Sequence, residues 1–234
     1  MTTFGLVHGA WHGAWCWDPL VGELEARGHR AVAPELPSDD PGASLADYAA
    51  AVADSLADVE GDAVIVGHSL GGLTIPLVPQ LRPVAALVFV AAFVPRPGVS
   101  AQEEFQTGGF RLAPGFDAGR TVDDLGRSRL DPEKAAAELF HDLDPDAALA
   151  AAARLRPQAQ RPQQEPHPLQ SWPEVSSYFI HCARDRSHTR EFDQSHARER
   201  LGVGLLEIDS GHSPFLSNPR ELAAILDGLA PRPK

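Results

Sequence analysis

The fold of this chain is decided by the stretch Ala63-Val64-Ile65-Val66-Gly67-His68-Ser69-Leu70-Gly71-Gly72. Its first four residues form a short apolar run that is typical of a buried strand. The next five residues match the pattern G-x-S-x-G, and a helix-compatible segment begins at Leu70. In that context the pattern predicts a nucleophile elbow, a sharp strand-to-helix turn that exposes the serine Oγ. We therefore expect Ser69 to be a nucleophile.

A phosphate-binding, glycine-rich turn is the alternative interpretation of this stretch. The five letters alone arise by chance in roughly one such chain in ten, so the flanking strand and helix carry the specificity. A P-loop requires Gly-Lys-Ser/Thr, whereas the only lysines of the chain are Lys134 and Lys234. The sequence therefore favours the nucleophile elbow.

Composition limits the classes of protein to which the chain can belong. Its 234 residues, 43% hydrophobic and 22% charged, predict one globular domain. The net charge of −12 argues against nucleic acid or an anionic membrane as a partner. No apolar run reaches the roughly 20 residues of a membrane span. The first strand begins without a signal-peptide pattern, and two cysteines form no disulfide framework, so we expect a cytoplasmic protein.

Apolar runs alternate with helical patterns along most of the chain. Strands are expected at 3–7, 30–33, 63–66, 84–90, 177–182 and 204–208, and helices at 19–27, 44–59, 189–200 and 219–229. Strands that are apolar almost throughout are typical of a parallel sheet covered on both faces. We predict an α/β fold with a six-stranded, mostly parallel sheet in the order 2-1-3-4-5-6.

The alternation breaks at Pro95, after which Pro and Gly interrupt the chain to about Trp172. We interpret 95–171 as a cap insertion over the carboxyl edge of the sheet, and 1–94 with 172–234 as the α/β core. Helical patterns within the insertion cover 132–141 and 145–155, whereas 156–168 is Pro- and Gln-rich and is expected to be irregular. The insertion has too few large apolar residues for a core of its own.

A serine nucleophile needs a general base, and the base needs an orienting carboxylate. In a parallel sheet these groups meet only on loops at the carboxyl ends of the strands. Of ten histidines, His212 lies on such a loop, directly after the sixth strand, and is the predicted base. Asp185 follows the fifth strand and is the predicted acid. Asp209 is too close to His212 in sequence to face it, and Asp193 is expected on the next helix.

Two backbone N–H groups are expected to stabilise the oxyanion, those of Leu70 and of Ala10 in the loop after the first strand. His8 and His12 in that loop are four residues apart, but they lie on a Gly-rich loop and lack a third ligand at suitable spacing. We therefore expect no metal and no cofactor.

These residues resemble a known family. The stretches 8–17 (HGAWHGAWCW), 67–72 (GHSLGG) and 211–213 (GHS) are similar to those of the plant methylesterase and hydroxynitrile lyase family of α/β-hydrolases and its bacterial esterase relatives. The resemblance extends from the first strand to the last helix and is weakest in the cap. It implies a Ser69–Asp185–His212 triad and an oxyanion hole at Ala10 and Leu70.

The resembled family contains two chemistries, ester hydrolysis and cyanohydrin cleavage. Its lyases of this type carry a threonine and a lysine at the positions of Gly9 and Ser213. Neither residue found here can hold the substrate hydroxyl or stabilise departing cyanide. Gly9 is also expected to leave room for an acyl group. The resemblance therefore favours ester hydrolysis.

We predict a serine carboxylesterase that hydrolyses a small carboxylic ester through an acyl-Ser69 intermediate, without nucleic-acid or membrane partners. A hydroxynitrile lyase and a slow-turnover, ligand-binding receptor of the same fold stay open as alternatives. The ester itself and the oligomeric state, including a homodimer, also stay open. The expected substrate-pocket residues are Gly9, Trp11, Phe110, Phe140 and Trp172.

Overall fold

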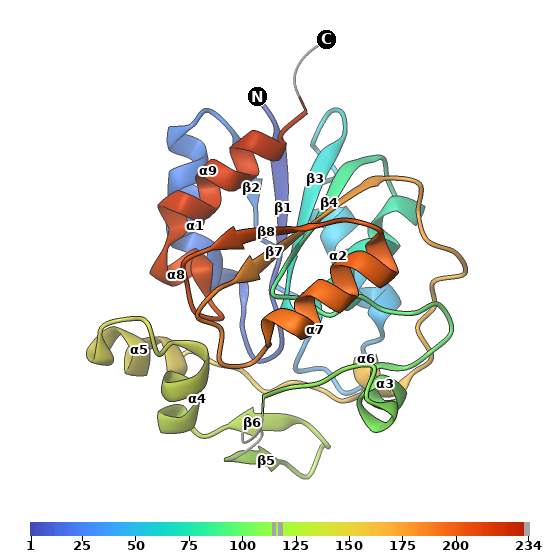
Figure 1. Cartoon of the computed structure of the whole chain (residues 1–234). Helices are drawn as coiled ribbons and strands as arrows, with labels where there is room; N and C mark the ends of the chain where they lie inside the picture. The colour runs from blue at the N-terminus through green and yellow to red at the C-terminus, as the bar shows by residue number, and fades with distance from the viewer. Residues whose placement is uncertain (114–115, 117–118, 232–234) are drawn as a thin grey trace.

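The computed structural model describes residues 1–113, 116 and 119–231. Its central sheet has six parallel strands in the order β2-β1-β3-β4-β7-β8 (Figure 1). The strands are β1 (Thr3–Val7), β2 (Arg30–Val32), β3 (Ala63–His68), β4 (Val84–Val90), β7 (Ser176–Cys182) and β8 (Leu205–Ile208). The predicted α/β sheet and its strand order are therefore confirmed.

Helices cover both faces of the sheet (Figure 1). Phe4, Leu6 and Val64 point to the face that packs against α1, α8 and α9. Val7 and Ile65, one residue along, point to the face covered by α2 and η3, because successive strand side chains alternate between faces. The helices of the core are η1 (Ala14–Trp17), α1 (Asp18–Ala26), α2 (Leu45–Ser55), η2 (Ser69–Leu73), η3 (Ile75–Gln80), α7 (Arg190–Ser195), η4 (His196–Leu201), α8 (Pro214–Ser217) and α9 (Pro219–Leu229).

The segment after the elbow consists of two 3₁₀ turns, η2 and η3, instead of the expected helix. Pro76 and Pro79 lack the N–H groups that α-helical hydrogen bonds require. The backbone also packs very closely here. A Cβ at Gly72 would lie 2.2 Å from the carbonyl oxygen of Phe93, and a Cβ at Gly71 would lie 2.7 Å from that of Val7. The two glycines thus allow the elbow to pack directly against β1 and the end of β4.

The insertion lies together at one end of the sheet (Figure 1). Its elements are α3 (Ala101–Thr107), β5 (Arg120–Val122), β6 (Ser128–Leu130), α4 (Pro132–Leu139), α5 (Pro145–Ala152) and α6 (Arg161–Gln164). Trp11 of the core joins its apolar cluster and donates from Nε1 to Ser128 Oγ at 3.0 Å. The antiparallel β5–β6 hairpin and the short α6 were not expected. The two strands have three residues each and α6 has four, which is too short to give a recognisable sequence pattern.

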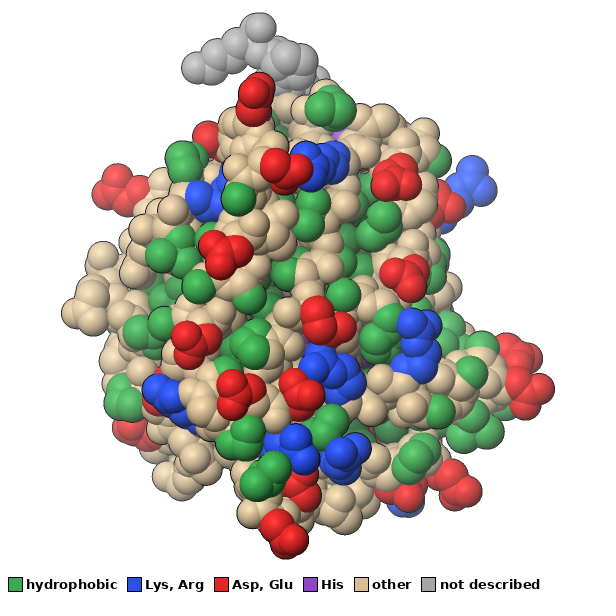
Figure 2. Space-filling view, turned by 180° about the vertical axis from the view of Figure 1, so that it is seen from behind, with side chains coloured by type: hydrophobic (Ala, Val, Ile, Leu, Met, Phe, Trp, Pro, Cys, Tyr) green, Lys and Arg blue, Asp and Glu red, His purple; other side chains and the backbone are tan. Residues whose placement is uncertain are grey.

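Within the described ranges, no helix combines the length and apolar composition needed to cross a bilayer. Figure 2 shows acidic and basic side chains interspersed with apolar ones over the face opposite to that of Figure 1.

Candidate active site

Ser69 occupies a strained turn directly after β3. Its φ is 50°, in the left-handed region that non-glycine residues rarely adopt. The carbonyl oxygen of Ser69 accepts a hydrogen bond from the Phe93 N–H at 3.1 Å, which ties the turn to the chain after β4. Ser69 lines a cavity of about 360 Å³. The turn thus presents the serine to a pocket of small-molecule size.

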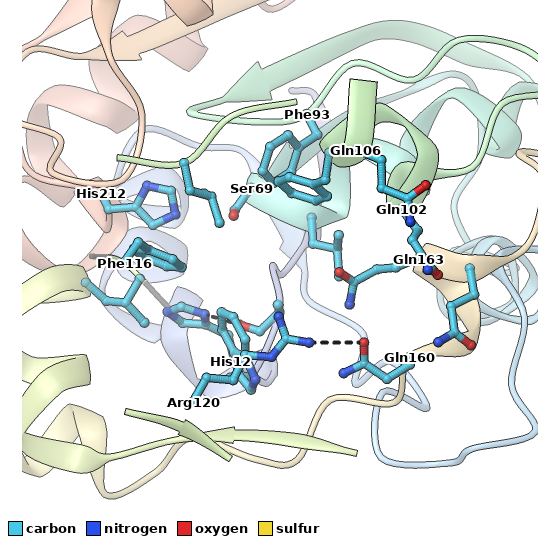
Figure 3. A pocket seen from close by; sticks show the side chains of 17 residues that line it. His12, Ser69, Phe93, Gln102, Gln106, Phe116, Arg120, Gln160, Gln163 and His212 are labelled. Atoms are coloured by element: carbon cyan, nitrogen blue, oxygen red, sulfur yellow. Dashed lines mark hydrogen bonds between the residues drawn. The ribbon is translucent and has the colours of Figure 1, made fainter. Parts of the chain in front are cut away.

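His212 lies on the loop between β8 and α8 and lines the same cavity as Ser69 (Figure 3). Its Nδ1 is 2.7 Å from Asp185 Oδ2 and donates to it. Its carbonyl oxygen accepts a hydrogen bond from His68 Nε2 at 2.9 Å, so the loop is attached to the residue before Ser69. With Nδ1 protonated, Nε2 of the neutral imidazole is free of a proton and able to accept one.

Asp185 is buried behind His212, in the turn after β7. Its Oδ1 accepts the N–H groups of Ser187 at 2.6 Å and His188 at 3.2 Å. Burial raises the pKa of Asp185, but the charge and hydrogen bond of His212, the charge of His188 and the Ser187 N–H outweigh burial and lower that pKa to about 2. Asp185 is therefore ionised at neutral pH and holds the imidazole as a pure acceptor.

A second buried carboxylate lies beside this pair. Asp193 on α7 contacts two histidines, with His181 Nδ1 at 2.8 Å and His188 Nδ1 at 3.1 Å. Burial lowers the pKa of His188, but its hydrogen bond to Asp193 and the charges of Asp193 and Asp185 raise the pKa overall. The rings of His188 and His212 are 5.4 Å apart. The sequence analysis missed His188. Its position three residues after Asp185 placed it near the site, but its pairing with Asp193 depends on how α7 packs.

The insertion also reaches the loop that carries His212. Asp142, between α4 and α5, accepts the Gly211 N–H at Oδ2, at a distance of 2.6 Å. The same oxygen lies 3.4 Å from Ser210 Oγ. Asp142 is therefore a positioning residue for this loop, and the contact between positions 142 and 211 has no local signal in the sequence.

The expected oxyanion donors, Ala10 and Leu70, line the cavity together with Ser69. Leu70 is in the first turn of η2, where backbone N–H groups have no partner within the helix. The Ala10 N–H has no acceptor among the described residues. His12 Nδ1 donates to the Ala10 carbonyl at 2.9 Å and fixes the turn. Both N–H groups are thus available to a ligand oxygen.

The pocket wall differs from the one expected from the sequence. Only Trp11 of the five expected residues lines the cavity. Phe110 packs in the core against Phe93, with ring centroids 4.6 Å apart, and Trp172 packs on Phe89. Phe140 is fully buried in the cluster of the insertion. The expectations for these three residues were wrong because packing turns their rings away from the cavity.

Gly9 does not line the main cavity either. A Cβ at this position would lie 2.9 Å from Ser69 Cβ and 2.9 Å from His68 Nδ1. The space in the Cβ direction of Gly9 is therefore occupied by the elbow, and Gly9 lies outside the wall of the main cavity, contrary to its expected place in the substrate pocket. The apolar wall that the sequence missed consists of Leu70, Phe93, Phe105, Leu112, Phe116 and Leu139.

Buried neutral histidines are expected to make folding stability fall in acid. Burial is the main cause that lowers the pKa of His12 and of His196 to about 3. Unfolded histidine has a pKa of about 6.5, so below that pH the unfolded state binds more protons than the folded state. The stability is present above about pH 6.5 and is lost progressively towards pH 3. Each histidine should lower the free energy of unfolding by about 2 kcal/mol at pH 5.

Calorimetric Tm measurements from about pH 7 to pH 5 check this expectation. His196→Gln keeps a donor for the Gly109 carbonyl, which His196 Nε2 now contacts at 3.0 Å, and should reduce the fall in Tm. A fall of the same size in this variant would contradict the assignment.

Known proteins with similar sequences are hydrolases and esterases. Residues 6–225 match the alpha/beta hydrolase family. The chain is 28% identical to a pyrethroid hydrolase of Sphingobium wenxiniae, with 100% of this chain and 89% of the relative covered. It is 31% identical to the probable esterase PIR7A of Oryza sativa subsp. indica, with 97% of this chain and 96% of the relative covered.

Solved structures show the same fold. A pyrethroid hydrolase from Sphingobium faniae superposes with a TM-score of 0.79 at 26% identity, over 97% of this chain and 96% of that one. Polyneuridine aldehyde esterase superposes with a TM-score of 0.84 at 24% identity, over 98% of this chain and 99% of that one. Since the family match spans most of the chain and is supported by relatives aligned over nearly their whole length, this chain belongs to the alpha/beta hydrolase family.

Proposed function

We propose that this enzyme hydrolyses a small carboxylic ester through an acyl-Ser69 intermediate. The observation that carries the proposal is the convergence of Ser69 and His212 on one cavity, with Asp185 bonded to the far side of the imidazole. Two backbone N–H groups, of Ala10 and Leu70, border the same cavity. The similar proteins named as esterases and hydrolases support this reaction class.

In the first half of the proposed reaction, His212 Nε2 accepts the hydroxyl proton while Ser69 Oγ attacks the ester carbonyl carbon. The N–H groups of Ala10 and Leu70 stabilise the negative charge that develops on the carbonyl oxygen. The bond to the alcohol oxygen then breaks, and His212 returns the proton to the leaving alkoxide. Asp185 stabilises the imidazolium that forms between these steps.

In the second half, His212 deprotonates a water molecule that attacks the acyl-Ser69 carbonyl. The bond between the acyl carbon and Ser69 Oγ then breaks, and Oγ receives the proton from His212. This step releases the carboxylic acid and restores the free serine. The two halves together consume one ester and one water molecule and release one alcohol and one carboxylic acid.

The surroundings of Gly9 support hydrolysis over cyanohydrin cleavage. The lyases of the resembled family carry a threonine at this position. In this chain a Cβ there would be 2.9 Å from both Ser69 Cβ and His68 Nδ1. The lyase reading also requires a charged residue at position 213, where Ser213 is buried and uncharged. Cyanide release from mandelonitrile well above the buffer rate would instead support the lyase.

Trapping of the acyl-enzyme tests the proposal directly. We expect p-nitrophenyl acetate to be turned over, and acid-quenched samples to carry acetyl on the peptide that contains Ser69, as mass spectrometry detects. Acetyl on another residue only, or no turnover of any ester in a broad panel, would overturn it. A single burst followed by a stable adduct would indicate the ligand-binding receptor.

A further inference from the structure

The cavity has two chemically different ends. The end at Ser69 and His212 is walled mainly by aromatic and aliphatic side chains. The opposite end carries the side chains of Gln102, Gln106, Gln160 and Gln163 (Figure 3). With Gln164, five of the nine glutamines in the chain line this one cavity. We define these five residues, 102, 106, 160, 163 and 164, as the glutamine end of the pocket.

Two segments of the insertion build the glutamine end. Gln102 and Gln106 are four residues apart on α3 and therefore share a helix face. The other three glutamines lie in 160–164, on or next to α6, which packs against α3. Backbone hydrogen bonds join the two segments, from Gly98 N to His167 O at 3.0 Å and from His167 N to Val99 O at 3.3 Å. The glutamine end is thus held by the fold.

Gln160 has an unused hydrogen-bonding atom at this end. Its Oε1 accepts a hydrogen bond from Arg120 Nη2 at 3.3 Å (Figure 3). Its Nε2 is buried and has no partner among the described residues. Buried amide donors are satisfied in the great majority of native structures, so the Gln160 carboxamide would gain a hydrogen bond by turning Nε2 towards a ligand oxygen in the cavity. None of the other four carboxamides hydrogen-bonds a described residue.

The charge of this end distinguishes between ligand classes. A carboxamide offers two donors and an acceptor but no net charge. Arg120 is the one permanently charged side chain among the described residues of the wall, and its guanidinium already donates to Gln160. No carboxylate of the described residues lines the cavity. Five of the six polar side chains that we describe at this end are neutral carboxamides, so the surface matches a hydroxyl or amide group better than an alkyl chain. Binding of an anion through Arg120 is the alternative that the experiment below distinguishes.

We infer that the substrate is an ester with a neutral, hydrogen-bonding group, a hydroxyl or an amide, at the end remote from the ester bond. The apolar wall binds the part next to the ester, and the glutamine end binds the remote polar group. This inference rests on the proposed ester hydrolysis and specifies its substrate class.

Matched ester pairs test the inference. The acyl pair is p-nitrophenyl ω-hydroxyhexanoate and p-nitrophenyl heptanoate, which differ only in a terminal hydroxyl or methyl group. The alcohol pair is ω-hydroxyhexyl acetate and heptyl acetate. Further pairs extend each series from four to eight chain atoms. One of these lengths should place the terminal group at the glutamine end while the ester lies at Ser69. The quantity compared is the kcat/KM ratio of the hydroxyl ester to the methyl ester.

In at least one series, Gln160→Leu should lower this ratio by about 3- to 10-fold, the value of one hydrogen bond. Gln163→Leu, which breaks no hydrogen bond of the described residues, should act in the same direction. Gln170→Leu is the matched control, because Gln170 is exposed and outside the cavity, and it should leave the ratio unchanged.

Unchanged ratios in both pocket variants and in both series would overturn the inference. A wild-type preference for the p-nitrophenyl monoester of adipic acid over both neutral esters would also overturn it, because the remote group would then be an anion. Wild-type turnover of p-nitrophenyl acetate separates the two proposals. If that turnover is present, only the inference fails, and if no ester is hydrolysed, the proposed function fails with it.

Discussion

Replacement of Ser69 by alanine is expected to lower kcat for p-nitrophenyl acetate by a factor on the order of 10⁵–10⁶, because the proposed acyl intermediate forms on Ser69 Oγ. The fold should survive the change. Ser69 Oγ hydrogen-bonds no described residue, and alanine fits the space of serine. Steady-state kinetics measure the loss, and circular dichroism with a thermal melt measures the fold.

The matched control for this variant is Ser177→Ala. Ser177 is a half-buried serine of β7 outside the cavity, and its replacement should leave kcat within a factor of about two. Undiminished turnover in a folded Ser69→Ala protein would remove Ser69 from the mechanism. The residual rate of Ser69→Ala should also show no pre-steady-state burst.

Asp185→Asn should lower kcat by a factor on the order of 10⁴. An asparagine whose oxygen accepts the Ser187 and His188 N–H groups would turn its NH₂ group towards His212 Nδ1. The imidazole would then have to accept at Nδ1 and carry its proton on Nε2. In that tautomer Nε2 cannot take the proton of Ser69, so the base would be lost while the geometry stays intact.

Asp209→Asn is the control for this substitution. Asp209 is three residues from His212, but its side chain is 78% exposed and pairs with Arg184 at 2.8 Å. Its replacement should change kcat by less than about twofold. If Asp209→Asn were as damaging as Asp185→Asn, the orienting role could not be given to Asp185 alone. Because the pKa of Asp185 is lowered to about 2, protonation of this carboxylate should not limit activity at moderately acidic pH.

The sheet was predictable because its signals are local. Runs such as 84–90 are apolar at nearly every position, which only a doubly covered parallel strand requires. The G-x-S-x-G pattern placed Ser69 at a strand end, and the topology then limited Asp185 and His212 to neighbouring loops. The hydrogen bond between the last two, at 2.7 Å, joins residues that the sequence had already paired.

The pocket was not predictable in the same way. Phe110, Phe140 and Trp172 have the same aromatic character as Phe93 and Phe116, yet only the last two face the cavity. Burial is proportional to apolar area and has no direction, so composition does not tell which ring lines a cavity and which fills a core. The choice is made when the insertion packs on the core.

The sequence by itself determined the order of the parallel strands and the loops that carry Ser69, Asp185 and His212. Only the tertiary structure decided the contact of Asp142 with the loop of His212, the Asp193–His188 pair beside it and the glutamine end of the pocket. Strand patterns and turns depend on neighbouring residues. These contacts join residues 5 to 69 positions apart, or residues from separate segments of the insertion, and they form when the chain packs.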